Sequence, residues 1–329
     1  MDWDFIFTAS VSYALGAISV AYCLAAIGLN MQFGYTGLLN FGQAAFLAAA
    51  GYGLAVSVTT FGLSFWTGLF IGLLCTIVLA MLLGIPTLRL RADYLAIVTI
   101  AAAEVVRLIV RSVKFKDDLG GSDGLQQFAD RFYELSPVPE GTRVNWGPLL
   151  FSEQELWVMI VGWTLIVVFS ILTYLLVHSP WGRVLKGIRE DEDAVRSLGK
   201  NVYWYKMQAL VLGAVVAGFG GFILGVFFNA VSPDTYATAL TFAIYTILIL
   251  GGAARVMGPV LGVVIFAFLF QFVDQALKEA VRADYITFLD SSETAQVRLV
   301  LVGVGLMLLM IYRPQGILGD RREIALDAR

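Results

Sequence analysis

The sequence predicts an all-α membrane protein, a bundle of about nine (8–10) transmembrane helices of which some are broken. Of its 329 residues 59% are hydrophobic and 14% are charged, whereas a soluble domain has about 45–50% apolar and about 25% charged residues. The run 5–88 contains no charged residue and far exceeds the roughly 20 residues that cross a bilayer. Because the apolar runs lack the alternation of barrel strands, and the bilayer offers the backbone no water, helices are expected.

Hydropathy and charge divide the chain, residues 1–329, into nine apolar segments of one domain. The first has no Lys or Arg before it, so it is expected to be retained as one helix and not removed as a signal peptide. The segments are 5–29, 36–59, 64–84, 94–112, 155–177, 203–228, 235–252, 258–273 and 297–312.

Two glycine-rich, partly polar stretches interrupt these segments, at 30–42 and at 251–259. Broken backbone at membrane depth is tolerated only where protein buries it or where it lines a cavity, so such breaks often mark transport pathways. We therefore expect Asn30, Asn40 and Gln43 to belong to a substrate pathway.

Two ionisable residues lie inside the fourth segment, Glu104 and, one turn later, Arg107. A charge at this depth is costly and indicates a functional site, here the same pathway. An ion pair within the helix that faces the bundle is an equally good interpretation.

The distribution of Lys and Arg predicts the orientation in the membrane. Loops 85–93, 178–206, 251–257 and 313–329 hold 13 of the 22 basic residues, and basic residues favour the cytoplasmic side. The N-terminus is then outside and the C-terminus cytoplasmic, with a long outer loop at about 113–154.

The longest basic loop resembles a capped amphipathic helix at about 180–199. Ser179 suits the N-cap, Pro180 the first helical position and Gly199 the C-terminal stop. A helix lying in the lipid interface is one interpretation, but the four acids 190–193 would be repelled by an anionic leaflet. Docking onto a cytoplasmic protein is favoured. The apolar residues at helical spacing are Trp181, Val184, Leu185, Ile188, Val195 and Leu198.

The sequence contains no motif that would let this chain catalyse a reaction or bind a metal by itself. It has no GxxxxGK[ST] phosphate loop, no GxSxG and no Cys/His cluster, and its single histidine, His178, borders a loop. We expect no enzyme activity, no metal and no cofactor bound by this chain.

Six stretches in order resemble the membrane permease of the branched-chain amino acid ABC importers, across nearly the whole chain. Ala254 departs from the pattern, which has a further glycine there. The stretches are GYTGLLNFGQAAF (34–46), LRLRADYLAIVTIAAAEVVRL (88–108), GGSDGL (120–125), IREDEDAVRSLG (188–199), SPDTYATALTFAIYTILILGG (232–252) and RPQGIL (313–318).

The resemblance implies a permease in the cytoplasmic (inner) membrane, surrounded by lipid, with no nucleic-acid partner. It implies a second permease subunit, homologous or identical, two cytoplasmic ATPase subunits that hydrolyse ATP, and an extracytoplasmic substrate-binding protein. The inner helix would dock into the ATPase. The residues expected to couple the two are Ile188, Arg189, Glu190, Asp191, Glu192, Ala194, Leu198 and Gly199.

Alternatives in two other functional classes remain open at this point. Urea and other small-solute ABC permeases share much of the architecture. An ion-coupled secondary transporter would use Glu104 as its proton or sodium site and would need no ATPase. An assembly protein without any pathway is disfavoured by the two broken segments.

Overall fold

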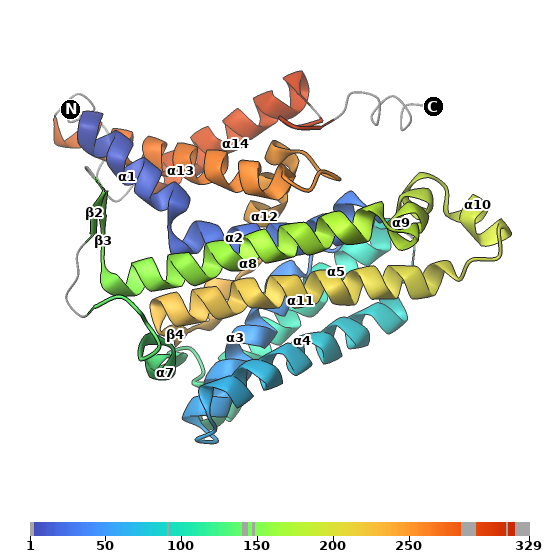
Figure 1. Cartoon of the computed structure of the whole chain (residues 1–329), viewed down its shortest axis with the longest axis horizontal. Helices are drawn as coiled ribbons and strands as arrows, with labels where there is room; N and C mark the ends of the chain where they lie inside the picture. Colours follow the sequence, from blue (N-terminus) through green and yellow to red (C-terminus); the bar gives the residue numbers. More distant parts are fainter. Residues whose placement is uncertain are drawn as a thin grey trace.

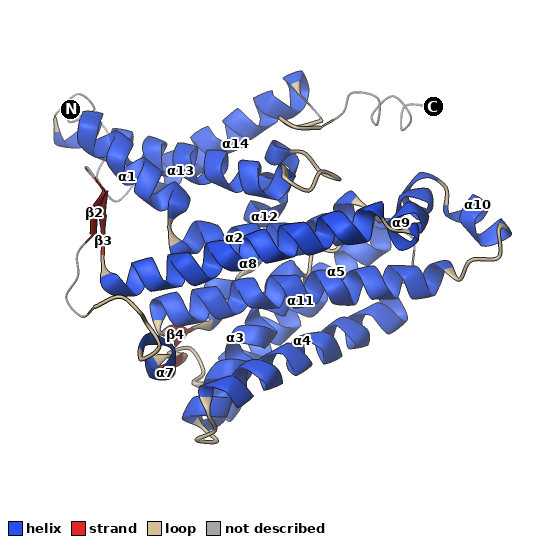
Figure 2. Ribbon diagram, viewed as in Figure 1, coloured by secondary structure: helices blue, strands red, loops and turns tan. Residues whose placement is uncertain are grey.

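The computed structural model describes residues 3–90, 92–139, 144–146, 149–283, 294–313 and 315–319, which form a helical bundle with two small two-stranded sheets (Figure 1, Figure 2). Each of the nine apolar segments contains helix, which confirms the helical fold class. The long helices are α1 (Trp3–Leu15), α2 (Ala17–Leu29), α3 (Gln43–Thr59), α4 (Phe65–Thr87), α5 (Ala92–Arg111), α8 (Glu153–His178), α11 (Val202–Phe228), α12 (Thr238–Gly251), α13 (Gly258–Arg282) and α14 (Thr294–Tyr312).

Shorter elements occupy the connections. They are η1 (Asn30–Gly34), η2 (Val113–Phe115), α6 (Lys116–Leu119), β1 (Leu125–Gln126), α7 (Asp130–Tyr133), β2 (Val144–Trp146), β3 (Leu149–Phe151), α9 (Pro180–Glu190), α10 (Glu192–Ser197), β4 (Ala230–Val231) and η3 (Pro233–Tyr236). Strand β1 pairs antiparallel with β4, and β2 with β3.

Helices α2 and α11 form the centre of the bundle, where most of their residues are buried. They cross at two glycines: a Cβ added at Gly28 would lie 2.2 Å from the carbonyl oxygen of Gly213. By contrast, α4 and α8 leave most of their apolar surface exposed, as expected of helices that face lipid.

Among the described residues, five helices are long and apolar enough to cross a membrane: 17–34, α4, α8, α11 and α13. Helices α3 and α12 and residues 296–305 are apolar but shorter. The total of about nine spans stays a prediction.

The first segment was expected to be one helix, and this is wrong. Helix α1 ends at Leu15 and α2 begins at Ala17, because Gly16 has an extended backbone with ψ 170°. The hydroxyl of Ser19 donates to the carbonyl of Tyr13 at 2.6 Å, which satisfies an acceptor that the break frees. A Cβ at position 16 would lie 3.1 Å from the carbonyl oxygen of Ser12, so the absence of a side chain relieves crowding at the bend.

The eighth segment was expected to end at residue 273, but α13 continues to Arg282. Its Asp274 has a side chain only 4% exposed and accepts from Arg298 of α14 at 2.8 Å and from Lys278 at 2.6 Å. The two cations balance the buried carboxylate. The charged residues that follow position 273, up to Arg282, therefore lie inside the helix and not in a loop.

The loops gather at two ends of the bundle. At the end that carries α9 and α10, the guanidinium of Arg89 lies 5.8 Å from the ring centroid of Tyr203, and the amide of Ile317 donates to the carbonyl of Leu250. The opposite end carries β1 and β4 and the contact from Thr60 to Asp118. The described parts of the loops that the charge pattern assigns to one side therefore share the α9 end.

Candidate functional site

The break after α2 holds a group of buried polar side chains that hydrogen-bond to one another inside the bundle. Helix α2 loosens into the π-helical turn η1, and regular structure resumes only at Gln43. Within the loop, Asn40 donates to Gln32 Oε1 at 2.8 Å and to Gln43 Oε1 at 3.3 Å, and its own Oδ1 accepts from the Gly42 amide at 2.9 Å. The side chain of Asn40 thus closes the turn that starts α3.

Further polar side chains fasten this loop to the rest of the bundle, and the sequence analysis did not select them. Tyr245 of α12 donates to the carbonyl of Asn40 at 2.9 Å. Thr241 accepts from the amide of Ala44, and Thr99 of α5 accepts from the amide of Phe41, each at 3.0 Å. Each lies in a stretch that carries the family resemblance, which is the signal that could have identified it.

These contacts show what the side-chain amides that the sequence assigned to a pathway bind in this structure. Asn40 and Gln43 are almost completely buried, and Gln43 donates to the carbonyl of Ala25 at 3.0 Å. Their hydrogen bonds therefore go to protein groups and hold the broken backbone, as buried polar groups require.

Asn30 joins the first break to the second. Its Nδ2 donates to the carbonyl of Arg255 and its Oδ1 accepts from the amide of Ala254, both at 2.8 Å. Ala254 has a φ of 59°, a left-handed conformation that favours glycine. The two hydrogen bonds from Asn30 help to hold alanine in that conformation.

Arg189 connects α9 to the same region. Its Nη1 donates to the carbonyl of Gly34, the last residue of η1, at 2.7 Å. A continuous series of contacts therefore runs from α9 through η1 and Asn30 to the loop 252–257.

The amphipathic helix expected at 180–199 is two helices, so that expectation is wrong in its continuity. Ser179 accepts from the amide of Gly182 as N-cap, with Pro180 at the first position, as expected. The chain then breaks at Asp191, whose backbone is extended and whose Oδ1 accepts from the Ala194 amide at 3.0 Å. Aspartate is a strong N-cap, so it starts a second helix here. Gly199 ends the unit with a φ of 75°.

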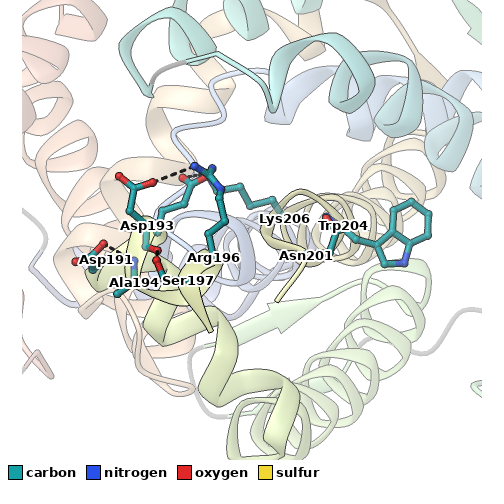
Figure 3. A network of polar contacts seen from close by, with 9 residues as sticks. Asp191, Asp193, Ala194, Arg196, Ser197, Asn201, Trp204 and Lys206 are labelled. Atoms are coloured by element: carbon teal, nitrogen blue, oxygen red, sulfur yellow. Dashed lines mark hydrogen bonds and ion pairs between the residues drawn. The ribbon is translucent and has the colours of Figure 1, made fainter. Parts of the chain in front are cut away.

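Side-chain ion pairs set the orientation of α10 (Figure 3). Glu192 contacts Lys206 of α11 and Arg196, and Arg196 also contacts Asp193 at 2.9 Å. Asn201 caps α11 through the Trp204 amide. These contacts lie within the chain, so Glu192 helps to set the orientation of α10 against α11.

The proposed coupling residues divide into buried and exposed ones. Ile188 is 4% exposed and packs in a small core with Leu185 and Val195, so it offers little surface to a partner and holds this chain's own fold. Leu198 was expected on that apolar face but is 79% exposed. The break at Asp191 changes the direction of the chain. The exposed members of the set are Arg189, Glu190, Asp191, Ala194, Leu198 and Gly199.

Glu104 and Arg107 form a bidentate ion pair on α5, with a shortest distance of 2.6 Å. Arg107 also contacts Asp234 of η3 at 3.0 Å, and Arg111 lies 3.5 Å from the same carboxylate. The Glu104 side chain is 37% exposed. The residue thus belongs to a partly exposed cluster of ion pairs that joins α5 to η3.

Within the described ranges, no three His, Cys, Asp or Glu side chains are grouped so that they could hold a metal ion.

Known proteins resemble this chain along most of its length. Residues 12–311 match the family model described as branched-chain amino acid transport system / permease component. The chain is 30% identical over 328 residues to the high-affinity branched-chain amino acid transport system permease protein LivM of Salmonella typhimurium, covering 96% of this chain and 72% of that protein. It is 26% identical to a probable LivM of Methanocaldococcus jannaschii and 24% identical to LivH of Escherichia coli, with 91% of both chains covered in each case. The chain belongs to the branched-chain amino acid transport permease family.

Proposed function

We propose that this chain is a permease subunit of an ATP-driven importer and that it carries a branched-chain amino acid across the cytoplasmic membrane. Family membership supports this function over a urea permease or an ion-coupled carrier. The ion-paired state of Glu104 supports it too, because a coupling carboxylate has to release and bind its ion.

The partners follow from the same proposal. Both LivM and LivH permeases are similar to this chain, which supports pairing with a second, homologous permease. Two ATPase subunits supply the energy and a binding protein delivers the substrate from outside. The α9 end faces the cytoplasm, because most basic residues lie in its loops.

The observation that carries the coupling proposal is the contact from Arg189 to Gly34. The ATPase would dock on the exposed surface of α10, around Ala194 and Leu198. A movement of α9 would pull on η1 through Arg189 and on the loop 252–257 through Asn30. Both breaks lie at the ends of core helices, so they would change shape without unfolding the bundle.

The broken segment itself would form part of the substrate pathway. Its polar amides hold the loop 35–42 while the ring of Phe41 stacks on that of Tyr245, with the centroids 4.4 Å apart. Such an aromatic surface beside a movable loop suits an aliphatic side chain. In this proposal Asn30, Asn40 and Gln43 shape the pathway indirectly, by positioning the backbone.

Reconstitution tests the function directly. The chain would be co-expressed with its partner subunits, inserted into vesicles and supplied with binding protein and internal ATP. We expect uptake of leucine, isoleucine or valine that needs ATP. Uptake of urea alone, or uptake driven by a proton gradient without ATP, would refute the proposal.

Labelling of single cysteines tests the orientation. Lys200→Cys lies at the α9 end and Asp123→Cys at the opposite end, and both positions are exposed. We expect a membrane-impermeant maleimide applied to intact cells, with the outer membrane permeabilised, to modify position 123 and to spare position 200 until the cells are lysed. The reverse pattern would invert the topology.

Replacing Glu104 tests the ion-coupled alternative. Since Glu104 is half-exposed and paired with Arg107, Glu104→Gln should leave uptake within about twofold of wild type, as expected for an exposed ion pair worth about 0.5 kcal/mol or less. Uptake would be measured from pH 6 to pH 8, with Glu134→Gln as a control in another exposed pair. Complete loss of uptake at normal protein level would instead favour a titrating site.

A further inference from the structure

A long apolar groove runs along α8 at the α9 end and is not used by the proposed transport mechanism. Its volume is about 800 Å³, within the range of specific ligand sites. One wall is α8 from Trp163 to His178, and the other is the start of α13 with the loop before it. Val167 and Ile171 on the α8 wall are 55% exposed, so the groove opens to the surroundings of the bundle.

The charged side chains among the described lining residues of this groove are basic and lie at one end. They are Lys186 of α9 and Arg255 of the loop 252–257, and no Asp or Glu is among the described residues of the lining. The ammonium of Lys186 lies 6.0 Å from the ring centroid of Tyr35, which also lines the groove. A ligand with an apolar body and an anionic end would match this pattern.

The length of the groove matches one leaflet of a membrane. Trp163 and His178 are 15 residues apart on one helix, or about 22 Å at 1.5 Å per residue. One half of a bilayer, headgroups included, is about 20–22 Å deep. The basic residues lie where the loops begin, at the level expected of lipid headgroups.

We propose that the α8–α13 groove binds one anionic phospholipid. Its phosphate would contact Lys186 and Arg255, and an acyl chain would lie along Trp163, Val167 and Ile171. The headgroup would thereby bridge α9 and the loop 252–257, the two elements that are also joined through Arg189, Gly34 and Asn30.

Native mass spectrometry of the assembled importer tests the headgroup site. The complex would be purified with its partner subunits and offered phosphatidylglycerol and phosphatidylcholine with the same acyl chains. Each basic residue near an anionic lipid contributes about a factor of five in affinity. We therefore expect Lys186→Gln with Arg255→Gln to weaken retention of phosphatidylglycerol by about 30-fold, and Lys186→Gln alone by about fivefold.

The matched control is Arg183→Gln with Lys200→Gln, which removes two exposed charges from the same end outside the groove. This pair should retain phosphatidylglycerol as wild type does. Equal retention of both lipids by wild type, or equal loss in both double variants, would overturn the proposal.

The acyl-chain site needs its own pair of variants. Ile171→Trp would fill the groove, whereas Leu172→Trp places the same bulk on the neighbouring exposed position outside it. We expect only Ile171→Trp to displace phosphatidylglycerol. Unchanged retention in Ile171→Trp would overturn the placement of the chain.

A photo-crosslinking residue at Val167 identifies the occupant in the membrane. Crosslinks to phospholipid, enriched in anionic species relative to the bulk membrane, are expected. A crosslink to a polypeptide would show that a protein covers the groove and would overturn the proposal.

Discussion

Ala194→Glu should abolish substrate-stimulated ATP hydrolysis and prevent co-purification of the ATPase. Ala194 is exposed on the short helix α10 (Figure 3). If the ATPase packs against Ala194, the new carboxylate is either buried in the contact without a partner or keeps the ATPase away from α10. Such a buried unpaired charge costs about 3 kcal/mol or more, equivalent to at least about 100-fold in affinity.

The same substitution should leave the permease itself stable. Position 194 is in the first turn of α10, close behind the N-cap Asp191, where a negative charge is favourable with respect to the helix dipole. Thermal unfolding of the purified permease and its membrane insertion should therefore match wild type. Ala283→Glu, an exposed alanine elsewhere, is the control for added charge. Wild-type coupling in Ala194→Glu would show that α10 is no docking surface.

Ile188→Ala should behave in the opposite way. Ile188 lies on the buried face of α9, where it packs with Leu185 and Val195. Truncating a buried isoleucine costs about 2–5 kcal/mol. We expect a lower unfolding temperature of the permease before any loss of ATPase contact. Thermal scans on the isolated permease separate the two substitutions, and an unchanged unfolding temperature would contradict the buried placement.

Asn40→Ala should destabilise the bundle and stop transport. The side chain of Asn40 donates to the side-chain oxygens of Gln32 and Gln43 and accepts from the amide of Gly42. Each buried polar group left without a partner costs about 1–3 kcal/mol, so the loss sums to several kcal/mol. The measurements are the unfolding temperature in detergent and leucine uptake in vesicles. Gln154→Ala, which removes an exposed amide, should change neither.

A double-mutant cycle shows whether these amides act as one network. Gln32→Ala with Asn40→Ala should destabilise by less than the sum of the single substitutions, because the second change removes a group that the first has already left unpaired. Strictly additive losses would show that Gln32 and Asn40 act independently.

The sequence by itself determined the class of the molecule, the apolar segments and the positions of the two breaks. Hydropathy is a local property, and a long uncharged run has few alternatives to a membrane helix. The caps at Ser179 and Gly199 were also predictable, because a cap depends on its own residue and on the next few amides. The family resemblance added the substrate class and the expectation of partner subunits.

Only the tertiary structure decided what the polar residues contact. Asn30 binds a loop more than 220 residues away, and Arg189 binds Gly34 across 155 residues; no local pattern specifies such pairs. For the same reason Ile188 and Leu198 looked equivalent on one helical face, yet one is buried and the other exposed. A single aspartate cap at 191 turns the chain between them, and its effect depends on the packing of Val195 and Glu192 against the neighbouring helices.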